Sequence, residues 1–378
     1  MSTIAVHRPA RLPARPAGGG LRDVTSRLTR IVAIHFDPDG GTPYWLEHQR
    51  RLGIDARCEI RSAADLVKLG PMDEQALASR PVEDFIPRSM RHRRAECLIG
   101  ETAGTLGKPK YAVHRGDEFH AAFVEPFVAA ARCAGFPHEL NWLFIGPSGP
   151  HIIGKAANAC ARALGSPDCF TIDLDPRWAK KLPPGSFAWR RYVEHLEDQA
   201  LTILASQRIG VIFSTPVVLE SLGPRLSRTQ RDAIQGLHLG GLSVSAAQRA
   251  AFAQLFPNAV ILSGYGNTLF GVMPELAYSA DSGFSYYPHG ERLLIRIVPR
   301  DGGDASQRLS REVSYGERGQ VVVSRLDEMQ FIANMMERDL AERVPPPKWA
   351  MDDGFIGDGV RDPQPIVTAK VKPAVGLY

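Results

Sequence analysis

The sequence lacks the features that mark secreted, metal-stabilised and membrane-spanning proteins. Its five cysteines are widely spaced and form no CxxC pair, so neither a disulfide framework nor a zinc site is predicted. No apolar run reaches the roughly 18 residues that span a bilayer, and the most apolar stretch is interrupted by Glu125 and Arg132. The N-terminal residues have no apolar centre of the kind found in signal peptides. These absences predict a cytoplasmic protein without a membrane partner.

The sequence also carries no large net charge of either sign. The net charge is +4, and the basic cluster at residues 88–94 is best explained as a solvated surface. No pattern of base-reading or stacking residues accompanies it, so no nucleic-acid partner is predicted. Residues 1–22 are rich in proline, arginine and glycine and contain no acidic residue. We predict a disordered leader over residues 1–28, because the globular pattern begins near Leu28.

Beyond the leader, short apolar strands alternate with helices. Strands are predicted at 140–145, 170–174, 210–213, 237–239 and 260–263. Helices are predicted at about 151–164, 194–207 and 245–256, and two more begin at Thr42-Pro43 and Thr215-Pro216. This alternation predicts an α/β fold with mostly parallel sheets and flanking helices. The large domain is expected over 29–345, with a smaller β-rich subdomain at about 285–345, and residues 346–378 are expected to be a tail.

The most informative segment is the loop ETAGTLGKPK. Gly104 and Gly107 allow tight turns in which backbone amides point at phosphate oxygens. Thr102 and Thr105 add hydroxyl donors, and Lys108 adds positive charge. The loop is therefore a candidate for binding the β- and γ-phosphates of a nucleotide. A surface hairpin with a Gly-Lys turn is the alternative.

A second segment, residues 149–155, fits the G-x-x-x-x-G-K pattern of a P-loop. Ala156 stands where that motif has the hydroxyl for Mg²⁺, and Pro150 removes one amide donor. A helix start with a chance match is the better interpretation. A P-loop nucleoside triphosphatase that uses Lys155 stays a distant alternative.

Further candidate residues follow buried strands, at the edge where α/β sheets bind ligands. A tyrosine ring at this edge can stack on adenine, while hydroxyl and amide side chains beside it can reach a phosphate. A Gly-Gly pair after the preceding strand leaves bare backbone beside the same crevice, and an aspartate can accept hydrogen bonds from ribose hydroxyls. Structural turns and an exposed helix acid are the alternatives. The candidates are Gly240, Gly241, Tyr265, Gly266, Asn267, Thr268 and Asp339.

In order and spacing, these segments resemble the motifs of the adenylate-forming enzymes, which include acyl-CoA synthetases, luciferases and nonribosomal adenylation domains. Residues 102–110 are similar to the family's S-S-G-T-T-G-x-P-K loop, and residues 265–268 to its Y-G-x-T-E motif. Residues 316–323 resemble the G-E-x-G-E-L-V-V strand that precedes the family's ribose-binding aspartate, whose place Asp339 takes. The resemblance covers residues 40–345. It is strongest to the phenylacetate–CoA ligase-like branch, and truncated relatives from phenazine biosynthesis look similar.

This resemblance implies ATP-dependent activation of a carboxylic acid as an acyl-adenylate. The loop residues Thr102, Thr105 and Lys108 would hold the leaving pyrophosphate, and Thr268 would reach the α-phosphate. A small aromatic acid is the expected substrate, because members of this branch activate such acids. The candidate walls of its pocket are Trp142, Phe144, Phe213 and Phe270.

The departures from the family pattern shape the remaining expectations. Leu269 stands where the family has its Mg²⁺-binding glutamate, so Mg²⁺ would be held by nucleotide phosphates and water, with Glu275 as a weak substitute. Only 39 residues follow Asp339, which predicts that the C-terminal cap domain and its catalytic lysine are missing. We therefore expect the acyl-adenylate to pass to a partner, such as a reductase or an acyl-acceptor enzyme, with a homodimer as an open assembly. A non-catalytic protein that binds a nucleotide or an aryl acid is the rival.

Overall fold

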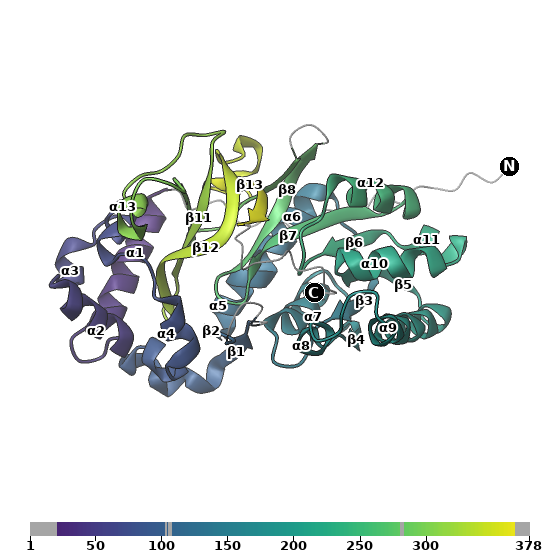
Figure 1. The fold of residues 1–378 in the computed structure, drawn as a ribbon, viewed down its shortest axis with the longest axis horizontal. Helices are drawn as coiled ribbons and strands as arrows, with labels where there is room; N and C mark the ends of the chain where they lie inside the picture. Colours follow the sequence, from purple (N-terminus) through teal and green to yellow (C-terminus); the bar gives the residue numbers. More distant parts are fainter. Residues whose placement is uncertain (1–20, 103, 105–107, 280–282, 367–378) are drawn as a thin grey trace.

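The computed structural model describes residues 21–102, 104, 108–279 and 283–366. Eleven strands form one continuous sheet in the order β10-β11-β12-β13-β9-β8-β7-β6-β5-β3-β4 (Figure 1). The five strands from β7 to β4 pair in parallel, and all the other pairs in this sheet are antiparallel. The predicted α/β fold is confirmed, with helices flanking the parallel half.

Continuous apolar runs form the parallel half, as expected for strands that are covered on both faces. Its strands are β3 (Asn141–Gly146), β4 (Phe170–Asp173), β5 (Ile209–Ser214), β6 (Gly236–Leu239) and β7 (Val260–Asn267). Its helices are α7 (Ile152–Ala163), α8 (Pro176–Ala179), α9 (Phe187–Ser206), α10 (Pro216–Leu222), α11 (Arg228–Ala233) and α12 (Ala246–Leu255). The predicted strands are confirmed. Helix α9 begins earlier than predicted, because Ser186 caps it by accepting a hydrogen bond from the Trp189 N–H group.

Side chains of the parallel strands alternate between two cores, one on each face of the sheet. On β3, Trp142 and Phe144 belong to the cluster that includes α7 and α6 (Glu125–Ala134). Their neighbours Leu143 and Ile145 belong to the other cluster, which includes side chains of α9, α10 and α12. Full burial stabilises the fold by about 1.5–3 kcal/mol for each large apolar side chain.

The antiparallel half extends further along the chain than predicted. Its strands are β8 (Gly271–Ser279), β9 (Gly283–Tyr286), β10 (Leu293–Val298), β11 (Arg318–Leu326), β12 (Phe331–Val344) and β13 (Gly359–Pro365), and helix α13 (Ala305–Leu309) precedes β11. The predicted tail from residue 346 is wrong up to residue 365, because β13 lies between β12 and β9 and pairs with both. Residues 367–378 lie outside the described part of the chain.

The predicted leader is wrong from residue 21 onward. Helix α1 (Leu21–His35) buries Leu28, Ile31 and Val32, which lie on one face at helical spacing. Residues 1–20 lie outside the described residues. The helix predicted at Thr42-Pro43 is confirmed as α2 (Pro43–Leu52). Two shorter helices follow, α3 (Ala56–Glu59) and α4 (Glu74–Ser79).

A separate two-stranded hairpin consists of β1 (Cys97–Glu101) and β2 (Tyr111–Arg115). In Figure 1 it lies below the centre of the molecule, between the N-terminal helices and the parallel half. Helix α5 (Gly116–Phe119) and a π-helical turn (His120–Val124) lead from it into α6. None of the helices in the described ranges combines the length and apolar character that a membrane crossing requires.

Candidate functional site

Tyr265, near the end of β7, donates its hydroxyl proton to the Oδ2 atom of Asp339 on β12, at 2.8 Å. In a flat sheet, the four steps from β7 to β12 would separate these strands by about 19 Å. Strand β13 pairs with β9 only at Val360 and Arg361, so the part of β12 that carries Asp339 can bend toward β7. The structure thus brings two candidate residues together. The alternative of an exposed helix acid is excluded, since Asp339 lies inside a strand.

Asn267 and Thr268 link the end of β7 to β12 and to the hairpin. The Asn267 Nδ2 atom donates to Glu337 Oε1 at 3.3 Å, and its Oδ1 atom accepts from the Leu269 N–H group at 2.9 Å. The Thr268 hydroxyl donates to the carbonyl oxygen of Glu101 at 3.4 Å. Since Glu101 directly precedes the candidate phosphate loop, Thr268 lies at the base of that loop.

The candidate phosphate loop connects the two hairpin strands. Its ends are closed by hydrogen bonds from the Thr102 N–H group to the Lys110 carbonyl oxygen at 3.0 Å and from the Lys110 N–H group to the Thr102 hydroxyl at 2.9 Å. Gly104 has a φ of 59°, which favours glycine, and Lys108 is exposed. Thr105 and Gly107 lie outside the described residues. The loop therefore connects the two strands of a hairpin. This topology is compatible both with a phosphate-binding loop and with a simple surface hairpin.

Acidic side chains gather where β12 meets the hairpin. Lys110 forms an ion pair with Glu74 of α4. Burial, together with the negative charges of Asp339 and Glu74, raises the pKa of Glu337 to about 7, against the opposing effects of Lys110 and of the hydrogen bond from Asn267. Burial also raises the pKa of Asp339. These carboxyl groups are therefore poorly solvated and gain from any hydrogen-bond donor that a ligand brings.

Replacing Glu337 by Gln is expected to raise stability at pH 8 and to leave it unchanged at pH 4. The folded protein holds the Glu337 proton up to about pH 7, whereas the unfolded chain releases it near pH 4.3. The free energy of unfolding of the wild type therefore falls as the pH rises from the unfolded-state pKa to the folded-state pKa. The amide of the variant has no proton to lose, so its stability does not change in this way. We expect a gain of about 1–3 kcal/mol at pH 8 in urea denaturation. Glu220→Gln, at an exposed position, is the control, and an equal effect of Glu337→Gln at both pH values would contradict the prediction.

The Gly240-Gly241 pair lies at the same edge of the sheet as Tyr265. The last pair between β6 and β7 joins Leu239 to Ser263, so the two glycines follow at the edge toward which Tyr265 extends β7. Gly241 has a φ of 79°, which a residue with a side chain rarely adopts. Bare backbone therefore borders this part of the site.

Gly266→Ala is expected to disturb the turn between β7 and β8. A Cβ atom at Gly266 would lie 2.0 Å from the Gly271 carbonyl oxygen and 2.9 Å from the Cα atom of Val272. Both neighbours are backbone atoms, so relief requires the strands to separate. We expect the free energy of unfolding to fall by about 1–3 kcal/mol in chemical denaturation. Gly116→Ala, whose Cβ would meet no atom closer than 3.9 Å, should be neutral or stabilising, and equal effects of the two changes would contradict the prediction.

The four aromatic residues predicted to line a substrate pocket are not brought together. All of them are buried side chains of the core. Trp142, Phe144 and Phe213 belong to one cluster, whereas Phe270 belongs to the cluster on the other face of the sheet. Sequence analysis missed His238 of β6, whose ring lies 4.1 Å from that of Phe213. The prediction of a shared pocket is therefore wrong for Phe270.

No protein-held magnesium site is found among the described residues. Leu269 is 2% exposed and packs in the core, so its position could not present a carboxylate to a ligand without rearrangement. Glu275 is engaged elsewhere, because it forms an ion pair with Arg249 and accepts hydrogen bonds from Ser263. No group of three or more potential metal ligands occurs in the ranges that the structure covers. These residues do not fit a protein-ligated Mg²⁺ ion.

The P-loop alternative finds little support. Lys155 lies inside α7 and its Nζ atom donates to the carbonyl oxygen of Ile99 on β1, at 3.4 Å. Pro150 and His151 precede the helix, and the His151 Nδ1 atom lies 3.3 Å from the Glu101 carbonyl oxygen. Both side chains therefore bind backbone oxygen atoms of β1, and the Lys155 ammonium group is engaged in the hairpin.

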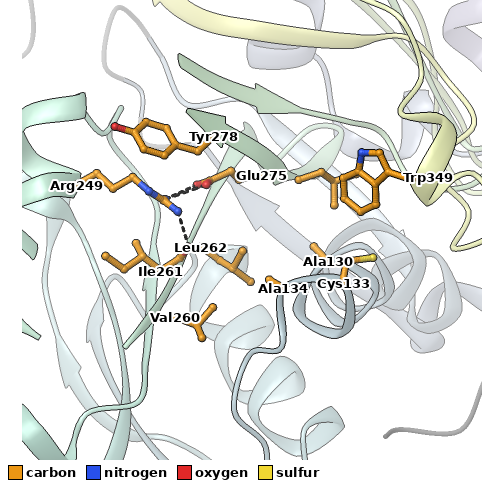
Figure 2. Close-up of a pocket in the computed structure, with 11 residues that line it drawn as sticks. Ala130, Cys133, Ala134, Arg249, Val260, Ile261, Leu262, Glu275, Tyr278 and Trp349 are labelled. Atoms are coloured by element: carbon orange, nitrogen blue, oxygen red, sulfur yellow. Dashed lines mark hydrogen bonds and ion pairs between the residues drawn. The ribbon is translucent and has the colours of Figure 1, made fainter. Parts of the chain in front are cut away.

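A cavity of about 340 Å³ opens at the opposite end of β7 (Figure 2). Arg249 and Glu275 form an ion pair on its wall, at 2.8 Å, and the Arg249 guanidinium lies 4.4 Å from the centre of the Tyr278 ring. Its remaining lining includes Val260 at the start of β7 and Trp349, which is largely exposed. Because Tyr265 and Thr268 lie at the other end of the strand, this cavity is distinct from the candidate site.

Sequence analysis also missed a buried polar network behind the site. Arg325 and Asp327 are fully buried, and Arg292 is 4% exposed. The Arg325 Nε atom lies 2.6 Å from Asp327 Oδ2, and the Arg292 Nη2 atom lies 2.7 Å from the same oxygen. In sequence, a charged residue within an apolar strand pattern is the only available signal of such a network.

Comparison with known proteins supports the fold. No protein-family model matches the sequence, and no curated protein matches it. Among solved structures, an open conformation of 2-hydroxyisobutyryl-CoA ligase in complex with 2-HIB-AMP and CoA has a TM-score of 0.62 and 12% identity, and the match covers 90% of this chain and 68% of the ligase. The same ligase in the thioesterification state has a TM-score of 0.63 and 15% identity, with 91% and 67% covered. In the postadenylation state with 2-HIB-AMP it has a TM-score of 0.63 and 14% identity, with 91% and 66% covered.

The present chain thus spans about two thirds of the ligase that it resembles. The match extends over nine tenths of the chain, so it includes parts of both halves of the sheet. Identity at this level carries information on architecture alone. The chain therefore has the fold of the adenylate-forming enzymes.

Proposed function

We propose that this protein activates a carboxylic acid with ATP, as an acyl-adenylate. The proposal is carried by one observation, the convergence of Tyr265, Thr268, Asp339 and the hairpin loop at one edge of the sheet. The site lies at the carboxyl end of a parallel strand, where α/β sheets commonly bind ligands. The adenylate-forming fold supplies the second support.

In this reaction a carboxylate oxygen of the acid attacks the α-phosphorus of ATP. A new O–P bond forms, the bond to the β-phosphate oxygen breaks, and pyrophosphate leaves with both bonding electrons. Catalysis consists mainly of positioning and of stabilising negative charge. In our proposal the loop from Thr102 to Lys110 holds the leaving pyrophosphate with its amides and with Lys108. Thr268 donates to the α-phosphate, and Asp339 accepts from the ribose hydroxyls.

Mg²⁺ enters this scheme only as a companion of the nucleotide. The described residues provide no carboxylate set for it, and Leu269 faces the core. Lys108, which is exposed, offers positive charge to the phosphates.

We further propose that the acid is a small aromatic one, that the protein belongs with the phenylacetate–CoA ligase-like branch, and that the acyl group passes to a partner enzyme. The motif resemblance supports the branch and, with it, a role in secondary metabolism such as phenazine formation. The aromatic acid rests on the same resemblance, because Trp142, Phe144 and Phe213 are packed in the core.

The test combines ATP binding with carboxylate-dependent exchange of pyrophosphate into ATP. Isothermal titration calorimetry measures ATP binding, and the exchange assay is run with benzoate, phenylacetate and their hydroxy and amino derivatives, next to aliphatic acids. Binding together with exchange for at least one acid would establish adenylation. Absence of ATP binding would refute the proposal.

A non-catalytic binding protein is the second candidate, and the burial of Leu269 at the position of the family's metal-binding glutamate favours it. The same experiment separates the two. ATP binding without exchange for any acid of the panel would favour this candidate, whereas exchange excludes it. Lys108→Ala and Lys155→Ala test the P-loop alternative. Only a loss of ATP binding in Lys155→Ala would support that alternative.

A further inference from the structure

Three consecutive backbone carbonyl groups at the end of β7 are held by three buried basic side chains. The Thr268 carbonyl oxygen lies 3.0 Å from His114 Nε2. The Leu269 oxygen accepts from Arg325 Nη1 at 2.9 Å, and the Phe270 oxygen accepts from Arg292 Nη1 at 2.6 Å.

His114 donates to this turn as a neutral side chain. The ring is fully buried, and burial together with the nearby Arg325 and Arg292 lowers its pKa well below the ordinary value. In a neutral ring the nitrogen next to a carbonyl oxygen carries the proton. The Nδ1 atom has no hydrogen-bond partner among the described residues. The bond to Thr268 is therefore the polar contact that accounts for a histidine at this position.

Arg325 ties the same turn to the hairpin. Its Nη2 atom donates to the carbonyl oxygen of Val113 on β2, at 2.6 Å, and Val113 N–H donates to Gln330 Oε1 at 2.8 Å. Asp327 forms ion pairs with both arginines and holds them in place. The turn, the hairpin and β11 are therefore joined through fully buried groups.

Thr268 is consequently fastened to both strands of the hairpin. Its hydroxyl contacts the Glu101 carbonyl oxygen on β1, and its own carbonyl accepts from His114 on β2. Packing adds to this, because a Cβ atom at Gly100 would lie only 2.6 Å from the Thr268 Cγ2 atom. The position of Thr268 relative to Glu101, which directly precedes Thr102, is thereby set by several contacts.

We propose that His114, Arg325 and Arg292 act as positioning residues, which form a clamp on the carbonyls of residues 268–270 and hold the Thr268 hydroxyl in register with the phosphate loop. This inference rests on the proposed function, because it assigns the clamp a role in aligning the α-phosphate with the leaving pyrophosphate. A buried clamp of hydrogen-bond donors suits this role, since a small displacement of a reacting group can lower a rate by about 100-fold.

The test uses His114, because its removal leaves both arginines paired. His114→Leu removes the donor and leaves the Thr268 carbonyl unsatisfied, whereas His114→Gln places an amide N–H near the position of the ring Nε2 atom. We expect His114→Leu to lower the maximal exchange rate by about 10- to 100-fold, with the ATP dissociation constant changed less than threefold. His114→Gln should recover most of the lost rate. Val193→Ala, a buried truncation in α9 away from the site, controls for lower stability.

A wild-type exchange rate in His114→Leu would overturn the clamp, and so would a loss that His114→Gln fails to recover. Hydrogen–deuterium exchange separates this failure from failure of the proposed function. If the wild-type protein shows no nucleotide chemistry, the clamp still predicts faster exchange of amides 266–271 in His114→Leu, with β10 and β11 unchanged. Unchanged protection of those amides would overturn the inference on its own.

Discussion

Replacing Asp327 by Asn is expected to lower the free energy of unfolding by about 3–5 kcal/mol. The Asp327 carboxylate is fully buried and lies within 3.2 Å of nitrogen atoms of Arg292, Arg325 and Arg27. The amide keeps the shape of the side chain and removes its charge. Two buried arginines then lose the carboxylate that pairs with both of them, which costs far more than the loss of an exposed ion pair.

The effect of Asp327→Asn depends on pH in a defined direction. The charges of Arg292 and Arg325 hold the pKa of Asp327 well below its ordinary value. A carboxyl group of this kind stabilises the fold at all pH values above about 3.9, the value for the unfolded chain. Below that value the unfolded chain takes up the proton first, so the contribution is lost as the pH falls. We therefore expect the difference between wild type and Asp327→Asn to be largest at neutral pH and to shrink below pH 4.

Urea denaturation between pH 3 and pH 7 measures this difference. Asp198→Asn is the matched control, because Asp198 is 68% exposed and pairs with Arg225 at 3.0 Å on the surface. It should change the free energy of unfolding by no more than about 1 kcal/mol. Similar losses in the two variants would mean that the buried network does not hold the fold together.

The parallel half of the sheet was predictable because its local signal is strong. Its strands are short runs such as the one from Trp142 to Ile145, in which every side chain is buried on one face or the other. A run of this kind needs no information about its neighbours to be identified as a strand. The motif residues at the ends of these runs share the same edge for the same reason, since parallel strands place their carboxyl ends together.

Strand β13 shows what the sequence does not contain. Its residues Asp362 to Pro365 include two prolines, a pattern typical of a loop. The segment becomes a strand because it pairs with β12 on one side and with β9 on the other. Asp362 also accepts a hydrogen bond from the Phe284 N–H group. Pairing of this kind depends on backbone groups that are far apart in the sequence, so composition cannot reveal it.

Helix α1 and the buried polar network could not be predicted from the sequence for other reasons. The apolar face formed by Leu28, Ile31 and Val32 adjoins a proline- and arginine-rich segment whose composition dominates any window. In the network, Arg325 lies in an otherwise apolar strand. One of its partners, Val113, is 212 positions away in the sequence, and another, Asp327, lies just beyond the end of the strand. Only the fold shows that a single residue serves the core and the candidate site together.

Replacing Asp339 by Ala is expected to raise the ATP dissociation constant by about 10- to 100-fold. One Asp339 oxygen accepts from Tyr265 and the other has no protein donor among the described contacts. In our proposal the carboxylate accepts from ribose hydroxyls, and hydrogen bonds to a charged group contribute about 1.5–3 kcal/mol each. A tenfold change in affinity corresponds to about 1.4 kcal/mol, which gives the expected range. Calorimetry with ATP measures the loss.

The same calorimetry with 2′-deoxy-ATP decides whether the ribose is the group that Asp339 contacts. Wild type should bind 2′-deoxy-ATP more weakly than ATP, whereas Asp339→Ala should bind both nucleotides alike, because the partner of the missing hydroxyl has gone. Tyr265→Phe keeps the ring and removes the hydrogen bond to Asp339, so it should lower the affinity for ATP less than Asp339→Ala does. Asp198→Ala should bind ATP as the wild type does. If Asp339→Ala weakens the binding of both nucleotides by the same factor, Asp339 acts through Tyr265 and the turn at Asn267 and not through the sugar. If it weakens the binding of neither, this edge of the sheet is not the nucleotide site.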